Sequence, residues 1–75
     1  MDRILEILWE LHPDVDFETA GHLIDDGILD SFDIVTIASE VDLDYGVTIP
    51  AEALTPENFN SARAIYALVE RLVKE

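Results

Sequence analysis

Cysteine is absent from this 75-residue sequence, and basic residues are scarce, with four Lys and Arg against 17 Asp and Glu. Without cysteine the chain has no disulfide, no thiolate nucleophile and no zinc–thiolate site. A formal net charge of −13 excludes the basic surface that nucleic-acid binding requires and disfavours binding to an anionic membrane. The natural complement is a partner with a basic surface, although an acidic protein that merely stays in solution has the same composition.

Long apolar runs are also missing, and none approaches the roughly 20 residues that a membrane-spanning helix needs. After Met1-Asp2-Arg3 the apolar residues alternate with charged ones and do not form the apolar segment of a signal peptide. We therefore expect a cytoplasmic, monomeric protein. The length predicts a single domain over residues 1–75, and an apolar content of 49% argues against disorder.

Apolar residues at helical spacing predict a first helix from a cap at Asp2 to about Leu11. Its apolar positions are Ile4, Ile7, Leu8 and Leu11, with Leu5 and Trp9 on a neighbouring flank. His12 followed by Pro13 ends the helix, because the residue before a proline avoids the helical region. The connection over residues 13–30 is unusually long for so small a domain. Its expected anchors are Phe17, Leu23, Ile28 and Leu29.

A second helix is predicted from Ser31 to about Tyr45, where Gly46 breaks it. The face assigned to the core holds Ile34, Ile37, Ala38, Val41 and Tyr45. The other side holds Val35, Thr36, Ser39 and Leu43. Single exposed apolar residues are ordinary, but Val35 and Leu43 on one side make a candidate docking surface.

Two further helices complete the chain. Thr55 as a cap, followed by Pro56, predicts a short helix to about Phe59. Asn60 or Ser61 is expected to cap the last helix. Its apolar stripe is Ala62, Ile65, Tyr66, Val69, Leu72 and Val73. The pattern predicts an all-α fold, a small four-helix bundle with three long helices, one short helix and a long first loop.

The candidate functional residues lie where the long loop meets the second helix. Gly27 marks a turn, and Asp30 or Ser31 offers the side-chain oxygen of an N-cap. Asp33 falls in the first turn, where the helix dipole favours a carboxylate. The pattern predicts a hydroxyl at the exposed start of a helix, and a phosphate esterified to Ser31 would lie near the free backbone N–H groups. The alternative is that Ser31 is only a cap.

Asp30-Ser31-Phe32, preceded by a Gly-Ile-Leu loop and followed by an apolar helix, resembles the attachment motif of acyl carrier proteins, which is usually Asp-Ser-Leu. The resemblance extends to Tyr-Gly-Val-Thr-Ile-Pro at residues 45–50 and to Leu-Thr-Pro-Glu-Asn-Phe at residues 54–59. It covers nearly the whole chain in order. It implies that Ser31 carries 4'-phosphopantetheine, supplied by coenzyme A, and that Asp30 and Phe32 belong to the attachment motif. The departure is Phe32 in place of leucine.

The resemblance also implies what the chain does and which proteins it meets. Carriers of this family hold an acyl or aminoacyl group as a thioester and present the second helix to their enzymes. The implied partners are a phosphopantetheinyl transferase and acyl- or aminoacyl-activating and transferring enzymes with basic or apolar docking surfaces. The residues expected to contact them are Asp33, Val35, Thr36, Ser39 and Leu43.

The cargo stays open among fatty acyl, polyketide, amino acid and D-alanine groups. The outward side of the second helix has fewer acids than in the carriers of fatty acid synthesis. The chain therefore looks closer to D-alanyl or peptidyl-type carriers. Because it starts at Met1 and ends soon after the last helix, we expect a stand-alone carrier.

Two alternatives to a carrier are an interaction module and an enzyme. A non-catalytic acidic interaction module would need Ser31 only as a helix cap. An enzyme has little support, because no serine-hydrolase elbow surrounds Ser31 and the chain is short for a closed pocket. His12 and His22 are isolated, and an EF-hand fails because Tyr45 and Ala51 occupy its sixth and twelfth positions. No catalytic residue and no metal site are predicted, although weak binding of divalent ions by clustered acids stays open.

Overall fold

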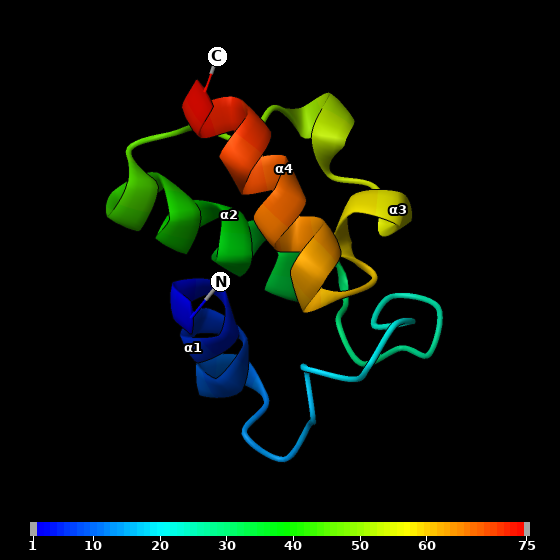
Figure 1. The fold of residues 1–75 in the computed structure, drawn as a ribbon. Helices are drawn as coiled ribbons and strands as arrows, with labels where there is room; N and C mark the ends of the chain where they lie inside the picture. Colours follow the sequence, from blue (N-terminus) through cyan, green and yellow to red (C-terminus); the bar gives the residue numbers. More distant parts are fainter. Residues whose placement is uncertain (1, 75) are drawn as a thin grey trace.

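Helices make up the regular secondary structure of the part of the chain that the computed structural model describes, residues 2–74 (Figure 1). They are α1 (Asp2–Leu11), α2 (Ser31–Tyr45), α3 (Pro56–Phe59) and α4 (Ala62–Lys74), with a 3-10 turn, η1 (Ala51–Ala53), before α3. The predicted all-α class is confirmed. The cap expected from Asp2 lies outside what the structure describes. Within residues 2–74, no helix has the length and apolar character that crossing a membrane requires.

The packing centres on α1 and α4. Helix α1 contacts both α2 and α4, and α3 lies against α4 (Figure 1). No polar or charged residue is buried among the residues described, so apolar burial is the main stabilising contribution. The largest fully buried side chains are Ile4, Ile7, Leu8, Phe17, Leu23, Leu29, Ile37, Val41, Phe59, Ile65 and Val69.

Helix α2 has the predicted bounds and the predicted inner face. Ile37 and Val41 are fully buried, and the half-buried members of this face, Ile34, Ala38 and Tyr45, pack against the core. Gly46 ends the helix with a left-handed backbone, at φ 69°, and its N–H donates to the carbonyl of Asp42 at 3.0 Å. A left-handed residue after the last turn is a common helix ending, and glycine adopts it without strain.

The buried face of α4 differs from the predicted stripe at two positions. Leu68 is buried although the prediction left it outside the stripe, and Val73 is 53% exposed although the prediction placed it inside. The physical reason for Leu68 is that α4 packs against two elements, α1 and α3, so its buried face is wider than one stripe. Val73 lies in the last turn and borders an open hollow.

Of the two start signals predicted for α3, Pro56 at the helix start is confirmed and the Thr55 side-chain cap is not. Thr55 has extended backbone, but its side chain makes no capping hydrogen bond. Pro56 occupies the first turn, where its fixed φ suits a helix and its missing N–H costs nothing. The turn η1 was not predicted. It is held against α3 by Asn58, whose Nδ2 donates to the carbonyl of Ala53 at 2.8 Å.

The connection from α1 to α2 is anchored at several points along its length. The expected anchors Phe17, Leu23 and Leu29 are buried, and Ile28 is half-buried. Trp9, at the edge of α1, donates from Nε1 to the carbonyl of Val15 at 2.9 Å. The indole therefore packs on the core and holds the start of the loop, as expected of a structural tryptophan.

A single amide fastens the later part of this connection to the junction between α3 and α4. Oδ1 of Asn60 accepts hydrogen bonds from the backbone N–H groups of Ile24, at 3.0 Å, and Asp25, at 3.3 Å. The backbone carbonyl of Asn60 accepts from the N–H of Leu23 at 2.8 Å. Of the two predicted caps of α4, Ser61 is the one that acts, because its Oγ accepts from the backbone there.

Candidate functional site at the start of helix α2

The first turn of α2 is closed by a reciprocal pair of hydrogen bonds. Asp30 has extended backbone, and its Oδ1 accepts from the N–H of Asp33 at 2.8 Å. In return, Oδ2 of Asp33 accepts from the N–H of Asp30 at 3.3 Å. This arrangement is a capping box. The cap that the sequence left open between Asp30 and Ser31 is therefore Asp30.

Ser31 is the first residue of α2, and its side chain is exposed. Within residues 2–74 its hydroxyl makes no hydrogen bond. Gly27, at φ 74°, turns the chain just before the helix, and Leu29 is buried in the core. The loop is thus fixed on its apolar side while the hydroxyl faces outward. Chemically, this leaves Ser31 as an accessible nucleophile with no structural task.

The carboxylate of Asp33 also points back into the protein. Its Oδ2 lies 2.9 Å from Nε2 of His12, which follows the end of α1. The side chain of Asp33 is only 16% exposed. Asp33 is among the residues expected to contact partners, but its carboxylate is engaged with the helix cap and with His12. His12 therefore joins α1 to the first turn of α2.

An ionic contact joins the same two helices nearer their other ends. The guanidinium of Arg3 contacts four carboxylates, on α1 and on α2. The two on α2 are Asp44, at 2.6 Å, and Glu40, at 3.5 Å. Hydrogen bonds to Asp44, and then to Glu6, raise the pKa of Arg3. Arg3 therefore stays charged across the ordinary pH range and neutralises acids of the α1–α2 contact.

The outward side of α2 is formed by uncharged side chains. Phe32 is 77% exposed, Val35 57% and Leu43 80%. Between them lie Thr36, which is half-buried and donates from Oγ1 to the carbonyl of Phe32 at 3.1 Å, and the exposed Ser39. The predicted outward position of Val35 and Leu43 is confirmed. Their role in docking stays a prediction.

The sequence identifies Phe32 only as part of the attachment motif. In the structure it begins the row of exposed apolar side chains that continues through Val35 to Leu43. The signal was present in the spacing, because residues three, four, seven and eleven positions apart share one side of a helix. This row of exposed or half-buried, uncharged side chains, the outer stripe, consists of Phe32, Val35, Thr36, Ser39 and Leu43.

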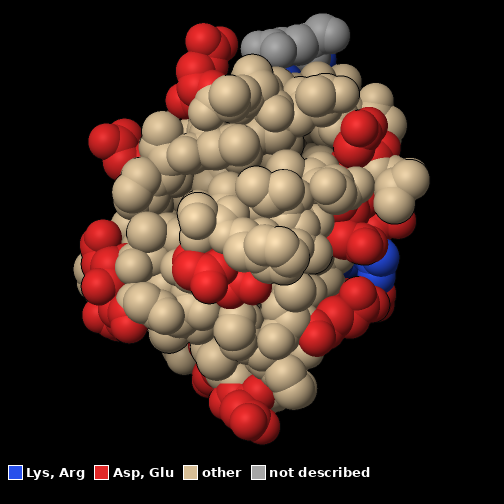
Figure 2. Space-filling model, turned by 180° about the vertical axis from the view of Figure 1, so that it is seen from behind, with Lys and Arg blue, Asp and Glu red and all other residues tan. Residues whose placement is uncertain are grey.

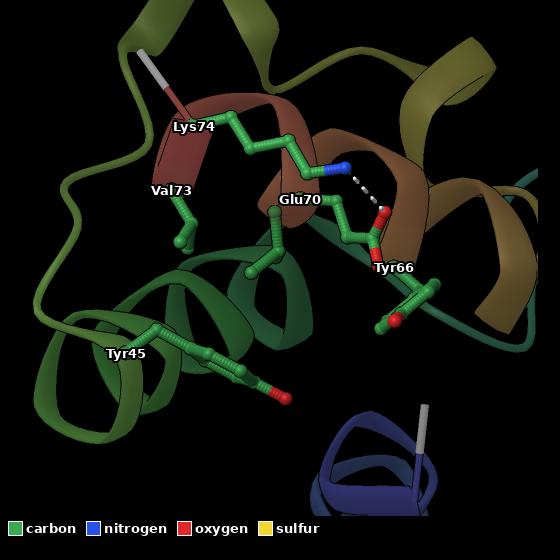
Figure 3. Close-up of a pocket in the computed structure, with 6 residues that line it drawn as sticks. Tyr45, Tyr66, Glu70, Val73 and Lys74 are labelled. Atoms are coloured by element: carbon green, nitrogen blue, oxygen red, sulfur yellow. Dashed lines mark ion pairs between the residues drawn. The ribbon is translucent and has the colours of Figure 1, made fainter.

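The far end of α2 borders a hollow of about 230 Å³ that the sequence did not reveal. Its lining comes from the end of α2 and from α4: Tyr45, Tyr66, Val69, Glu70, Val73 and Lys74 (Figure 3). Nζ of Lys74 lies 3.6 Å from Oε2 of Glu70. Hydrogen bonding with Tyr66, the main cause, lowers the pKa of Glu70. At a rise of about 1.5 Å per residue, this end lies about 21 Å along the helix from Ser31.

The charged groups of the surface are mostly carboxylates, as the composition requires. Figure 2 shows a face with a broad uncharged area and most of its carboxylates toward the margin. Among the described residues, no three His, Asp or Glu side chains gather in a way that could hold a metal ion. His22 has only a nearby carboxylate, with Nδ1 3.6 Å from Oδ2 of Asp25.

The chain was compared with models of protein families, with curated proteins and with solved structures, and none of the three comparisons found a match.

Proposed function

We propose that this protein is a stand-alone carrier of the acyl-carrier type, a small helical bundle that holds acyl or aminoacyl groups on 4'-phosphopantetheine attached to Ser31. The observation that supports it most is that the helix cap and the free hydroxyl at the start of α2 belong to two different residues. Asp30 provides the cap, so the exposed hydroxyl of Ser31 is free for modification. The order of the elements, with a long loop before α2 and a short helix before α4, fits the resemblance in the sequence.

The chemistry asked of the chain itself is limited. Oγ of Ser31 forms a bond to phosphorus as the pyrophosphate bond of coenzyme A breaks, and adenosine 3',5'-bisphosphate leaves with the electron pair. A phosphopantetheinyl transferase accepts the serine proton and binds the magnesium and coenzyme A. The attached arm supplies a thiol that holds the cargo as a thioester. By tethering the cargo, the carrier raises its effective concentration at each enzyme that binds the carrier.

The residues around Ser31 fit this group. The hydroxyl is unobstructed, and the free N–H groups of the first helical turn favour an attached phosphate. The carboxylate of Asp30 accepts from the N–H of Asp33, and the carboxylate of Asp33 accepts from the N–H of Asp30 and contacts His12. Neither carboxylate is hydrogen-bonded to the hydroxyl of Ser31. We propose a cytoplasmic monomer whose partners are the transferase and the enzymes that load and unload the arm. The cargo among fatty acyl, polyketide, amino acid and D-alanine groups stays open.

The first test is the intact mass of the protein after incubation with coenzyme A, magnesium and a broad-specificity phosphopantetheinyl transferase. We expect the addition of one phosphopantetheine to the natural chain and none to Ser31→Ala. Thr55→Ala is the matched control, because it removes a hydroxyl that also lies at a helix start and makes no capping hydrogen bond. This control should be modified as fully as the natural chain.

A non-catalytic interaction module remains the second candidate, and the exposed apolar residues of α2 are the observation that favours it. The same experiment separates the two functions. If the natural chain is folded and gains no mass while a known carrier is modified in parallel, the carrier proposal fails. The outer stripe would then be the remaining basis for a function.

A further inference from the structure

Ser31 lies midway between two anchored residues. Two positions before it, Leu29 is buried in the core. Two positions after it, Asp33 is bound to His12, with Oδ2 2.9 Å from Nε2. The buried leucine fixes the chain on the loop side of Ser31, and the contact with His12 fixes it on the helix side. The position of the Ser31 hydroxyl on the bundle therefore depends on one apolar anchor and one polar anchor.

The polar anchor has the features of a strong hydrogen bond. An ionised carboxylate only accepts, so Nε2 of His12 is the donor, and a hydrogen bond to a charged acceptor is stronger than one between neutral groups. The side chain of Asp33 is 16% exposed and that of His12 is 35% exposed, so water competes with this contact less than it does at an open surface. The same Oδ2 accepts from the N–H of Asp30. One carboxylate oxygen thus links His12 to the capping box.

His12 itself is held by its backbone. Its N–H donates to the carbonyl of Leu8 at 2.9 Å, which continues the hydrogen-bond pattern of α1 by one residue. Its carbonyl accepts from the N–H of Val15 at 3.3 Å, and Pro13 restricts its backbone further. Leu8, one turn earlier in α1, is fully buried. The imidazole therefore extends from the fixed end of a core helix.

The polar contacts of Arg3, also between α1 and α2, lie too far away to have the same effect. Arg3 binds Glu40 and Asp44, which stand about 14–20 Å along α2 from Ser31. Without the imidazole of His12, the first turn of α2 would keep its capping box but lose its hydrogen bond to the end of α1. Helix ends are where fraying begins. Arg3 therefore holds the two helices together, whereas His12 holds the turn that contains Ser31.

We propose that His12 is a positioning residue for the modification of Ser31. Through Asp33 it keeps the first turn of α2 ordered and fixed on α1, so that the phosphopantetheinyl transferase meets the hydroxyl in one geometry. This inference rests on the proposed function. If the turn is ordered in only a fraction of the chains, the apparent affinity for the transferase falls by that fraction. Once the enzyme has bound and ordered the turn, transfer proceeds as before. The effect therefore falls on KM and not on kcat.

The test compares two variants of His12 whose side chains have similar volumes. His12→Gln keeps an N–H that reaches Asp33, whereas His12→Leu keeps the bulk without a donor. The substrates are modified by a broad-specificity phosphopantetheinyl transferase with coenzyme A and magnesium. His12→Leu should raise KM by about threefold or more and leave kcat within about twofold of the natural chain. His12→Gln should keep both values within about twofold of the natural chain.

Two control variants separate positioning from general stability. Arg3→Leu removes the ionic contacts at the other end of the α1–α2 contact. His22→Leu removes the other histidine of the chain, which lies in the same connection and is 71% exposed. Both controls should keep KM within about twofold of the natural chain, even where the midpoint of denaturation falls. Circular dichroism at the assay temperature checks that each variant is folded.

Amide hydrogen exchange, followed by NMR, gives a readout that needs no enzyme. The N–H of Asp33 donates to Oδ1 of Asp30 in the first turn of α2. This amide should exchange about threefold faster or more in His12→Leu than in the natural chain, because the turn opens more often. Its exchange rate in His12→Gln and Arg3→Leu should stay within about twofold of the natural chain. Equal exchange rates in His12→Leu and the natural chain would overturn the proposal.

The outcomes separate this proposal from the one on which it rests. If Ser31 is modified and His12→Leu has an unchanged KM, His12 has no positioning role and the carrier proposal stands. If His12→Gln or Arg3→Leu raises KM as much as His12→Leu does, the effect belongs to general packing of the helices and the positioning proposal is overturned. If the natural chain is not modified while a known carrier is, both proposals fail.

Discussion

The two sides of α2 carry similar amino acids in opposite surroundings. On the inner side Ile37 and Val41 have no exposed surface, whereas on the outer side Val35 and Leu43 are more than half exposed. The difference comes from the neighbours, because α1 and the rest of the core cover the inner side and nothing in residues 2–74 covers the outer one. The inner side of α2 thus packs in the core, and its outer side is exposed.

The other long helices do not share this division. In α1 and α4 the apolar residues concentrate on one side, whereas in α2 they are spread around the helix. A helix that is apolar on several sides is usually buried. Helix α2 is buried on only one side. Its weak amphipathicity in an otherwise acidic chain therefore indicates that its exposed side has a function other than packing.

The largest effect on stability is expected when one side chain is truncated on each side of α2 and the two variants are compared. Ile37→Ala removes a fully buried side chain and should lower the free energy of unfolding by about 2–5 kcal/mol. Leu43→Ala removes a side chain that is 80% exposed and should change it by no more than about 0.5 kcal/mol. Chemical denaturation monitored by the fluorescence of Trp9 measures both. Equal losses of stability in the two variants would mean that the outer side is also packed, and would contradict the difference between the two sides.

A second pair of variants tests the division at the first turn of α2. Asp30→Ala removes the cap and should lower the free energy of unfolding by about 0.5–2 kcal/mol. Ser31→Ala removes an exposed hydroxyl without a hydrogen bond and should change it by less than about 0.5 kcal/mol. The same denaturation experiment measures this pair. A loss at Ser31 as large as at Asp30 would mean that the serine has a structural task.

The smallest effect concerns Tyr45, at the far end of the inner side. Partial burial, the main cause, and the nearby Asp44 carboxylate raise the pKa of Tyr45 above 10. Because the pKa is higher in the folded state, Tyr45 contributes a stability that is complete below pH 10 and is lost as the pH rises through the folded value. Tyr45→Phe should therefore reduce the loss of stability between about pH 9 and 11.

The direct readout for Tyr45 is the ultraviolet absorbance of tyrosinate in a Tyr66→Phe background. The chain has two tyrosines, so this background leaves Tyr45 as the only phenol that titrates. Its pKa should be higher in the folded chain than in the chain unfolded by urea. Equal values in the two states would show that the inner side does not shield Tyr45.

Much of the fold could be predicted because it follows from local patterns. The bounds of α2, its buried face and the loop anchors Phe17, Leu23 and Leu29 all come from apolar spacing and from Gly46 as a stop signal. Leu68 and Val73 were assigned wrongly, since spacing gives the direction of a helix face but not its width. That width depends on how many neighbours α4 has.

The site was predicted less completely, because its polar side-chain contacts join residues far apart in the chain. Arg3 reaches Asp44, 41 positions away, and His12 reaches Asp33, 21 positions away. Nothing in the local sequence pairs these residues. The sequence therefore predicted Asp33 as an outward docking residue, whereas the structure turns its carboxylate toward α1. Phe32 could have been added to the outward side from its spacing alone.

The capping box also has an evolutionary consequence. Since Asp30 and Asp33 hold the first turn of α2, replacing Ser31 by another small residue would leave the folded protein almost as stable as before. Selection for stability would then permit substitutions at position 31, whereas it would conserve the two residues of the capping box. If natural variants of this protein keep serine at position 31 while their other exposed hydroxyls change, the constraint must come from what is done to that hydroxyl.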